Sequence, residues 1–293
     1  MSREEGARGL DHPRRSRRLV ALTWQFTENP SRLISLSRLG EELGVAKSSL
    51  SEDAAIIDAT LRSLGVGRLE TVSGATGGLR FRPELAPALE EAWLHELARL
   101  LADPERILPG GYLYMSDIIF DPAWADRIGW ILAHRFREAG ADRVVTIETK
   151  GIPLGLMTAR ALHLPLVVIR HGSRVSEGSS VSVNYLSGSG PRIQTMSLAR
   201  RALVGARRAL VVDDFLRGGG TVLGIRQLLH EFDCEVAGVG VLAATRLPEV
   251  KRVDEYTALV EVGQVDEGAG RVEVRPLAPG GPGGEGERRH GEA

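Results

Sequence analysis

Two adjacent acids followed by a glycine-rich turn are the residues of this sequence best suited to bind a small ligand. An apolar stretch, 209–212, predicts a short buried strand, and Asp213 and Asp214 follow it directly. The turn at 217–221 then leads into an apolar-periodic helix that begins at Thr221. A strand, turn and helix in this order point backbone N–H groups at a phosphate, with the helix dipole behind them. Adjacent carboxylates suit neighbouring sugar hydroxyls, so the stretch predicts a site for a ribose that carries a 5-phosphate.

The same stretch resembles the motif with which type I phosphoribosyltransferases bind phosphoribosyl pyrophosphate (PRPP). Apolar residues precede the acid pair, and four residues separate the pair from Gly219-Gly220-Thr221. The resemblance implies that the acids contact the ribose 2- and 3-hydroxyls and that the turn binds the 5-phosphate. No lysine follows the last glycine, which excludes a Walker A loop. The alternative is an ordinary βα turn, with glycines for tightness and acids as a helix cap.

A second turn is expected beside the first. Residues 144–147 predict another buried strand, and Thr149, Lys150 and Gly151 follow it. Ligands of open α/β sheets bind beyond the carboxyl ends of the strands, so the two turns are expected to face one ligand. The second turn resembles the pyrophosphate loop of phosphoribosyltransferases. Lys150 then either meets pyrophosphate oxygens or lies in solvent.

Tyr112 stands near the start of the same predicted domain, where an aromatic ring either lies near the ligand or packs against the fold. The predicted ligand-binding residues are Tyr112, Thr149, Lys150, Gly151, Asp213, Asp214, Phe215, Leu216, Arg217, Gly218, Gly219, Gly220 and Thr221. The histidines are scattered and no CxxC or HExxH motif occurs. We therefore expect no metal site built by the protein, and Mg²⁺ would arrive on the ligand.

Composition limits the other classes of function. The chain has 293 residues and a net charge of −1, a length that suggests about two domains. No global positive field attracts nucleic acid, so any such binding must come from a local basic cluster. The single cysteine, Cys234, excludes an intramolecular disulfide and is expected in the core. Because the sequence has neither an apolar run of about 18 residues nor a signal peptide, we expect a cytoplasmic protein without membrane contact.

The N-terminal region has the pattern of a helix-turn-helix. Apolar residues at helical spacing over 36–43 end at Gly44, and a second apolar stripe runs over 50–64. In this motif the start of the second helix enters the major groove of DNA. The residues at those positions are Lys47, Ser48, Ser49 and Ser51. Lysine and hydroxyl groups suit phosphates and base edges, whereas a generic helical hairpin is the alternative.

Two groups of arginines add basic charge to this region. Residues 66–72 and 79–82 predict a β-hairpin whose return strand turns Leu79 and Phe81 to one side and arginines to the other, as a DNA-contacting wing requires. The arginines within 14–18 open a helix, where the dipole disfavours cations, so they either need an outside anion or form a solvated helix start. The arginines predicted to contact DNA are Arg14, Arg15, Arg17, Arg18, Arg80 and Arg82.

Two domains are expected. Residues 14–84 predict an α+β winged helix-turn-helix domain, and 107–275 an α/β domain like a type I phosphoribosyltransferase with a mainly parallel sheet. A linker helix is predicted over 85–106. Disorder is predicted over 1–13 and 276–293.

Stretches in both domains resemble one family, the bacterial purine operon repressors. They are 46–49, 51–53, 104–112, 149–153 and 192–197, together with the PRPP motif. The resemblance implies a homodimeric repressor of purine biosynthesis genes that binds double-stranded operator DNA, in the cytoplasm at the nucleoid. It also implies that PRPP lowers the DNA affinity and that no reaction is catalysed.

The region 174–197 predicts a long hairpin, which is a candidate lid over the ligand. We expect PRPP, with Mg²⁺ on its pyrophosphate, to order this hairpin. A guanosine tetraphosphate-like nucleotide would suit the same loops and compete with PRPP. Arg217 favours tight ground-state binding over turnover. The alternatives are an active purine phosphoribosyltransferase with an accessory DNA- or RNA-binding domain, and an α/β scaffold without a ligand.

Overall fold

The computed structural model describes residues 14–74, 77–173, 175–186 and 193–279. The disorder predicted for 1–13 and 280–293 lies outside the described residues, as do residue 174 and the segment 187–192 of the expected hairpin. The chain divides into two compact units. The first comprises residues up to 89 together with 160–163, and the second comprises the remainder.

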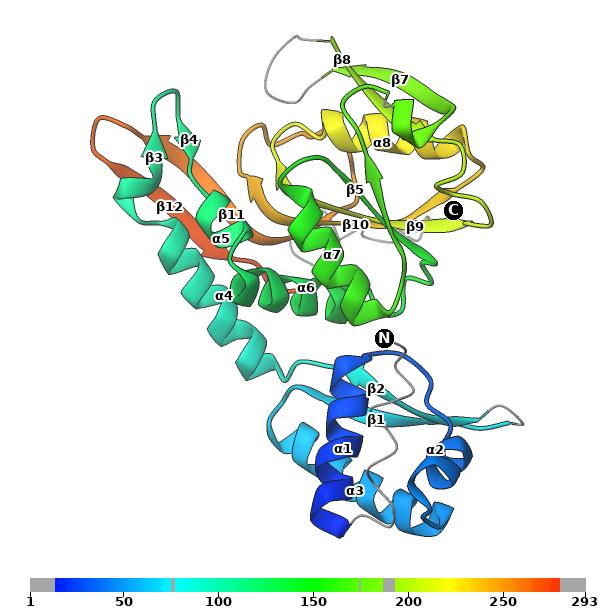
Figure 1. Ribbon diagram of the computed structural model, residues 1–293. Helices are drawn as coiled ribbons and strands as arrows, with labels where there is room; N and C mark the ends of the chain where they lie inside the picture. The colour runs from blue at the N-terminus through cyan, green and yellow to red at the C-terminus, as the bar shows by residue number, and fades with distance from the viewer. Residues whose placement is uncertain (1–13, 75–76, 174, 187–192, 280–293) are drawn as a thin grey trace, which may run out of the picture. The chain divides into compact units, whose positions relative to one another are not determined.

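The first unit packs a helix-turn-helix against an antiparallel wing (Figure 1). Its elements are α1 (Arg15–Glu28), α2 (Leu36–Leu43), α3 (Lys47–Ser63), β1 (Gly67–Val72) and β2 (Gly78–Pro83). Ser35 caps α2 by accepting the N–H of Arg38, and Gly44 ends the helix at φ 64°, a left-handed conformation that suits glycine. The apolar stripes meet around the fully buried Phe26 and Leu50. The predicted winged helix-turn-helix is confirmed.

Helix α4 (Pro87–Leu101) is shorter than the linker helix expected over 85–106. From Glu90 onward it belongs to the second unit, where its apolar stripe is buried, with Leu97 at 0 % exposure. The carboxylate of Glu90 accepts a hydrogen bond from Arg135 at 2.8 Å. Both side chains are nearly inaccessible to solvent. Most of this segment is therefore part of the core of the second unit rather than a free linker.

The second unit is built on a six-stranded sheet with the order β12-β11-β10-β9-β5-β6. Neighbouring strands are parallel except β12, which is antiparallel to β11. The strands are β5 (Arg143–Ile147), β6 (Leu166–Ile169), β9 (Arg208–Leu216), β10 (Glu235–Thr245), β11 (Thr257–Asp266) and β12 (Arg271–Pro276). The expected mainly parallel sheet is confirmed, and β9, one of its two central strands, carries the acid pair.

Helices cover both faces of this sheet (Figure 1). On one face lie α6 (Pro122–Phe136) and α7 (Gly151–Leu162), and the ring of Phe136 packs directly over Gly238 and Gly240 of β10. On the other face, α8 (Gly220–His230) joins an apolar cluster with the sheet. Cys234 is buried in that cluster, as expected.

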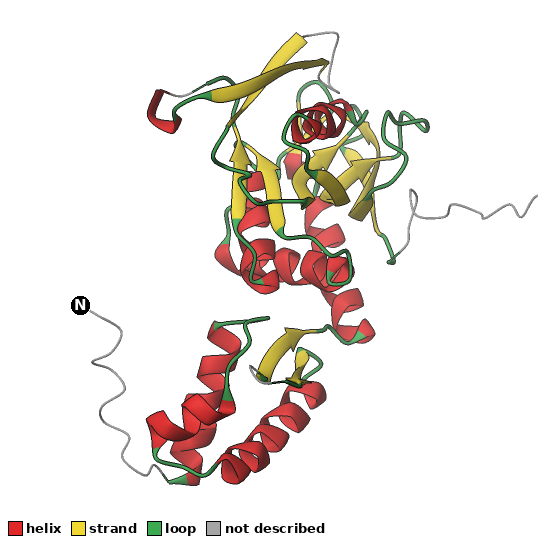
Figure 2. Ribbon diagram, turned by 90° about the vertical axis from the view of Figure 1, so that its right-hand side faces the viewer, coloured by secondary structure: helices red, strands yellow, loops and turns green. Residues whose placement is uncertain are grey.

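The hairpin of β7 (Ser180–Leu186) and β8 (Ile193–Ala199) forms a separate antiparallel pair. In both Figure 1 and Figure 2 it lies on the side of α8 that faces away from the sheet. Gly224 of α8 permits this contact, because a side chain there would collide with Tyr185 and Met196. The hairpin is confirmed, and its role as a lid remains a prediction.

Several short elements follow no strong sequence pattern. They are η1 (Pro104–Arg106), β3 (Ile107–Leu108), β4 (Tyr112–Leu113), α5 (Ser116–Ile119), η2 (Val175–Glu177) and the edge strand β12. The expected domain limit at residue 275 falls inside β12. Leu277 is buried beyond it and donates its N–H to the carbonyl of Leu259 at 2.9 Å. The predicted disordered tail therefore began too early, because the edge strand continues to Pro276 and Leu277 closes the core.

Candidate functional site

The acid pair lies within strand β9 rather than after it. Pairing with β10 continues to Leu216, so the strand is four residues longer than its apolar stretch, 209–212, indicates. Successive strand residues point to opposite faces. Asp213 is accordingly buried at 5 % exposure, whereas Asp214 faces a cavity.

The turn after β9 is fixed by contacts with Arg252 and Val253. Gly219 caps α8 in a left-handed conformation at φ 79°, and a Cβ at this position would lie 2.9 Å from a methyl group of Val253. The N–H of Arg252 donates to the carbonyl of Gly218 at 3.0 Å. Glycine is thus required both by the conformation and by the close approach. The backbone N–H groups at the start of α8 are left to face an anion.

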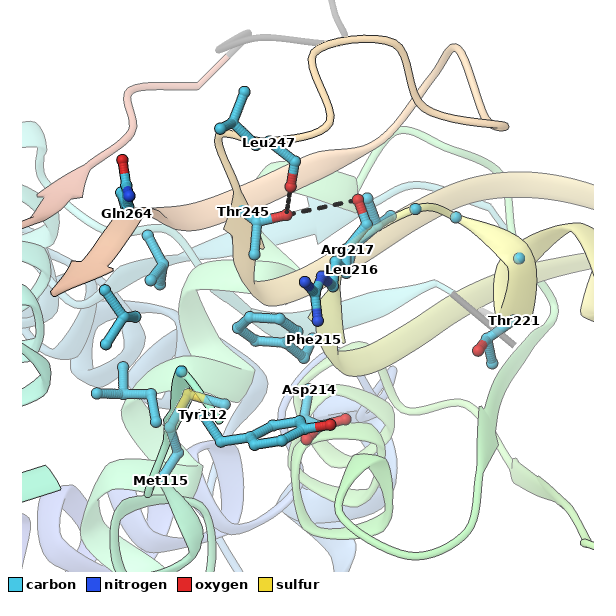
Figure 3. A pocket seen from close by; sticks show the side chains of 18 of the residues that line it. Tyr112, Met115, Asp214, Phe215, Leu216, Arg217, Thr221, Thr245, Leu247 and Gln264 are labelled. Carbon is cyan, nitrogen blue, oxygen red and sulfur yellow. Dashed lines mark hydrogen bonds between the residues drawn. The ribbon is translucent and has the colours of Figure 1, made fainter. Parts of the chain in front are cut away.

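A cavity of about 540 Å³ opens at the carboxyl end of β9 (Figure 3). Of the predicted ligand-binding residues, it is lined by Tyr112, Lys150, Asp214, Phe215, Leu216, Arg217, Gly218, Gly219, Gly220 and Thr221. Asp213, Thr149 and Gly151 are not among the lining residues. Gly151 lies behind the acid pair, since a side chain there would reach within 3.0 Å of the Asp213 Oδ1. Lys150 of the second turn and residues 217–221 of the first line the same cavity.

The two acids differ in their surroundings. Burial, and then the negative charge of Asp214, raise the pKa of Asp213. The Oδ1 of Asp213 accepts the backbone N–H of Asp214 at 2.9 Å. The nearby Thr146 hydroxyl is buried and has no hydrogen-bond partner in the described part of the chain. Asp213 consequently keeps its proton to a higher pH than an exposed carboxyl does, and Asp214 is the acid available to a ligand.

One wall of the cavity is apolar, and no local pattern in the sequence marks it. Leu113 and Met115 come from β4 and the residues after it, and Val262 and Val265 come from β11. Thr245 also lines the cavity, and its hydroxyl bonds a neighbouring backbone carbonyl at 2.6 Å. These segments are far apart in the sequence, and only the tertiary fold brings them together. A ribose phosphate would therefore occupy the polar side of a larger space.

The second turn is held by ion pairs at its base. Glu148 accepts the N–H of His171 at 2.6 Å and pairs with Arg170 at 3.1 Å. Arg170 also bonds Glu177 at 3.1 Å, in the short helix before β7. The backbone that presents Lys150 is thus connected to the start of the β7–β8 hairpin.

The start of α3 exposes the predicted DNA-contacting residues of the helix-turn-helix. Lys47 and Ser48 are exposed, and Ser49 is half-buried. The hydroxyl of Ser51 donates to the carbonyl of Lys47 at 3.0 Å, within the first turn. The surface at this helix end therefore combines one cation with small hydroxyl groups.

The arginines of α1 have an anion within the protein. Arg15 donates its Nε to Asp53 at 3.0 Å, and Arg18 donates its Nε to the same carboxylate at 2.7 Å. Asp53 lies on α3 and is fully buried. Arg15 and Arg18 therefore do not depend on an outside anion for a charge partner, whereas Arg14 and Arg17 are exposed.

The arginines of the wing share a carboxylate in the same way. Arg80 donates its Nε to Glu70 at 2.6 Å, and Arg82 donates a terminal nitrogen to Glu70 at 3.1 Å. The hydrogen bond from Arg80 is the main cause that lowers the pKa of Glu70. Leu79 and Phe81 are buried on the opposite side, as predicted. Neither Asp53 nor Glu70 stood out in the sequence as a partner of these arginines.

Comparison with known proteins decides the family. Residues 14–83 match the family model of the bacterial purine repressor N-terminal domain, and residues 115–272 match that of the phosphoribosyl transferase domain. The purine biosynthesis transcriptional repressor PurR of Bacillus subtilis (strain 168) is 43% identical over 262 residues, which cover 89% of this chain and 92% of that protein. The chain belongs to the bacterial purine repressor family. The purine biosynthesis transcriptional activator PurR of Lactococcus lactis subsp. lactis (strain IL1403) is 40% identical over 253 residues, 86% of this chain and 93% of that protein.

Enzymes match a smaller part of the chain. The xanthine phosphoribosyltransferase of Exiguobacterium sp. (strain ATCC BAA-1283 / AT1b) is 36% identical over 123 residues, 42% of this chain and 64% of the enzyme. Among solved structures, the adenine phosphoribosyltransferase from Thermoanaerobacter pseudethanolicus ATCC 33223 has a TM-score of 0.49 at 18% identity, covering 58% of this chain and 98% of that chain. Among the described residues, no helix combines the length and the apolar character needed to cross a membrane.

Proposed function

We propose that this protein represses purine biosynthesis genes by binding operator DNA, and that PRPP in the β9 cavity lowers its affinity for that DNA. The observation that carries the proposal is the joining of two parts in one chain. One is a domain of the purine repressor family, and the other is a cavity lined by Lys150, Asp214 and the turn 217–221.

Each chemical group of PRPP has a partner in this cavity. The 5-phosphate suits the backbone N–H groups at the start of α8 and the guanidinium of Arg217. The ribose hydroxyls suit the carboxylate of Asp214, and the pyrophosphate suits Lys150. Within the described part of the chain, no group of three His, Cys, Asp or Glu side chains could hold a metal ion. Mg²⁺ is proposed to enter as part of the ligand, on its pyrophosphate.

A sensor without catalysis is favoured over a transferase. The relatives that cover most of this chain are named as transcriptional regulators, whereas the xanthine phosphoribosyltransferase matches 42% of it. Arg217 adds a fixed positive charge to the phosphate turn, which tightens binding of the ground state. Uniform binding of this kind does not raise turnover. The second candidate is an active purine phosphoribosyltransferase, which the similarity to the xanthine phosphoribosyltransferase supports. An assay for the nucleotide product distinguishes the two candidates.

Several features of the proposed regulator follow from its kind of DNA-binding domain. A helix-turn-helix protein reads a two-fold symmetric operator as a homodimer, which we propose for this chain in the cytoplasm at the nucleoid. A guanosine tetraphosphate-like nucleotide is proposed to compete with PRPP, because its phosphates suit the same two turns. We propose repression because the Bacillus subtilis relative is named a repressor. The Lactococcus lactis relative is named an activator, so the direction of control must be measured.

The test is DNA binding at fixed salt, by fluorescence anisotropy, with duplexes from upstream of purine biosynthesis genes and with or without Mg-PRPP. The same reactions receive a purine base and are analysed for nucleotide. Tight binding that Mg-PRPP releases, without nucleotide formation, supports the sensor. Absence of DNA binding together with base-dependent consumption of PRPP would make the protein an enzyme.

A further inference from the structure

Glu70 lies at the centre of the outward face of the wing. In the register of β1 and β2 it stands directly opposite Arg80, and it also bonds Arg82. The side chain of Arg82 is 19% exposed, whereas that of Arg80 is 35% exposed. Of the two arginines that share this carboxylate, Arg80 is therefore the one more accessible to DNA.

Asp53 organises the start of α1 in the same way. Its carboxylate is 1% exposed and bonds one mostly buried arginine, Arg18 at 15%, and one accessible arginine, Arg15 at 54%. The two carboxylates lie on different elements and are not neighbours in the sequence. The same arrangement thus occurs twice among the residues predicted to contact DNA.

The atoms that form these bonds decide what the accessible arginines can do. Arg80 and Arg15 both donate Nε to the carboxylate, which occupies one edge of the guanidinium. A terminal nitrogen of Arg15 also pairs with the exposed Glu52 at 3.9 Å. For Arg80, no other hydrogen bond is found among the described residues, and its terminal nitrogens remain available. The edge formed by the two terminal nitrogens can bond guanine O6 and N7 in the major groove, or two oxygens of a phosphate. A guanidinium held through Nε presents this edge in a fixed direction.

We propose that Glu70 and Asp53 are positioning residues for sequence recognition, which hold Arg80 and Arg15 so that each meets one defined group of the DNA. The inference rests on the proposed DNA-binding function. An arginine already fixed by a carboxylate loses little conformational entropy when it binds a DNA group that lies in its path. To reach a phosphate in another position it must first break a charge-assisted hydrogen bond. The carboxylates therefore increase discrimination between DNA sequences rather than total affinity.

The experiment compares two duplexes on the full chain. One is enriched from a random pool by the wild-type protein, and the other is a shuffled duplex of the same composition. Glu70→Gln keeps the shape of the side chain and removes its charge. We expect the ratio of the two dissociation constants to fall by about tenfold, since a bidentate arginine contact gives discrimination of that order. Binding to the shuffled duplex is expected to stay equal or tighten, with a salt dependence that rises by about 0.9 for each newly contacted phosphate.

Arg80→Lys tests whether Glu70 acts through Arg80. Lysine keeps the charge and lacks both Nε and the planar fork, so the same loss of discrimination is expected with little change on the shuffled duplex. The double variant Glu70→Gln/Arg80→Lys is expected to lose no more than Arg80→Lys alone. Losses that add in the double variant, or an equal weakening on both duplexes, would overturn the inference.

Glu273→Gln is the matched control, because Glu273 pairs with Arg246 at 3.1 Å in the second unit and carries the same charge. Its discrimination ratio should equal that of the wild type. Asp53→Asn is the corresponding test at α1, with helical content checked by circular dichroism because Asp53 is buried. A wild-type protein that does not discriminate the duplexes overturns the proposed function itself. Discrimination that survives in Glu70→Gln overturns only the positioning role.

Discussion

Asp214 donates its backbone N–H to the Oδ1 of Asp213 at 2.9 Å, so the two acids of the ligand site are bonded to each other while only Asp214 faces the cavity. The pair therefore has two roles. Asp214 is the acid that a ribose would meet under the proposed function, and Asp213 accepts the backbone N–H of Asp214 from the interior. Their separation follows from their place in strand β9, where neighbours point to opposite faces.

The stability of the protein is expected to depend on the proton held by Asp213. Burial and the charge of Asp214 raise the pKa of this carboxyl. The folded protein then binds the proton more strongly than the unfolded chain does. The resulting stabilisation is complete below the ordinary value of about 3.9 and is lost as the pH rises through the raised value. Asp213→Asn cannot lose this proton. Its free energy of unfolding, measured with urea, should therefore increase relative to that of the wild type as the pH rises.

Asp214→Asn serves as the control for this dependence. It removes the charge that helps to raise the pKa of Asp213, so the loss of stability should be smaller and should end at a lower pH than in the wild type. Parallel stability profiles for the wild type and Asp213→Asn would contradict a buried, proton-holding Asp213.

Arg217→Ala is expected to weaken PRPP binding and to spare DNA binding in the absence of PRPP. A hydrogen bond to a charged group contributes about 1.5–3 kcal/mol, which corresponds to roughly a 10- to 150-fold loss of affinity. Calorimetric titration with Mg-PRPP measures it. The assignment of the phosphate turn is wrong if this variant loses DNA binding when no PRPP is present.

Gly219→Ala is expected to abolish the response to PRPP through the backbone of the turn. The residue has a φ of 79°, and its Cβ would lie 2.9 Å from Val253. Gly205 is the matched control, because it has a φ of 76° and no atom would lie within 4 Å of its Cβ. Gly205→Ala should cost only the conformational strain, about 1 kcal/mol, with PRPP affinity unchanged. Equal PRPP affinities in both variants would show that the turn does not hold the phosphate.

Local sequence patterns were sufficient for one side of the site. The acid pair and the turn at 217–221 are contiguous, and strand, turn and helix follow from a dozen residues. The apolar wall was not predictable in this way, because Met115 and Val265 come from distant parts of the sequence and meet only through the tertiary fold. The edge strand β12 was missed for a related reason, since its short alternation of charged and apolar residues is weak evidence without its partner β11.

The DNA-binding face shows the same limit. Arg80 and Arg82 alternate with apolar residues, so their outward direction was predictable from the strand period. Their ion pair with Glu70 depends on the hairpin register. The bonds from Arg15 and Arg18 to Asp53 span 38 and 35 residues, and no periodic pattern links residues so far apart. Net positive charge on this face is therefore smaller than a count of arginines indicates.

Lys47→Ala is expected to weaken binding to all DNA sequences alike. Lys47 is exposed at the start of α3 and suits a phosphate. Loss of one phosphate contact lowers the slope of log affinity against log salt by about 0.9. Titrations at several salt concentrations measure this slope. An unchanged slope would place Lys47 outside the interface.

The central claim is that PRPP and DNA binding are coupled, and coupling must be reciprocal. If Mg-PRPP lowers the affinity for operator DNA by some factor, operator DNA must lower the affinity for Mg-PRPP by the same factor, typically about 5- to 150-fold. The decisive measurement is the dissociation constant of Mg-PRPP for the full chain, with and without saturating operator duplex, at one salt concentration. We predict weaker PRPP binding on DNA, by the factor with which PRPP releases DNA. Equal PRPP affinity in the two conditions would contradict a PRPP-controlled repressor.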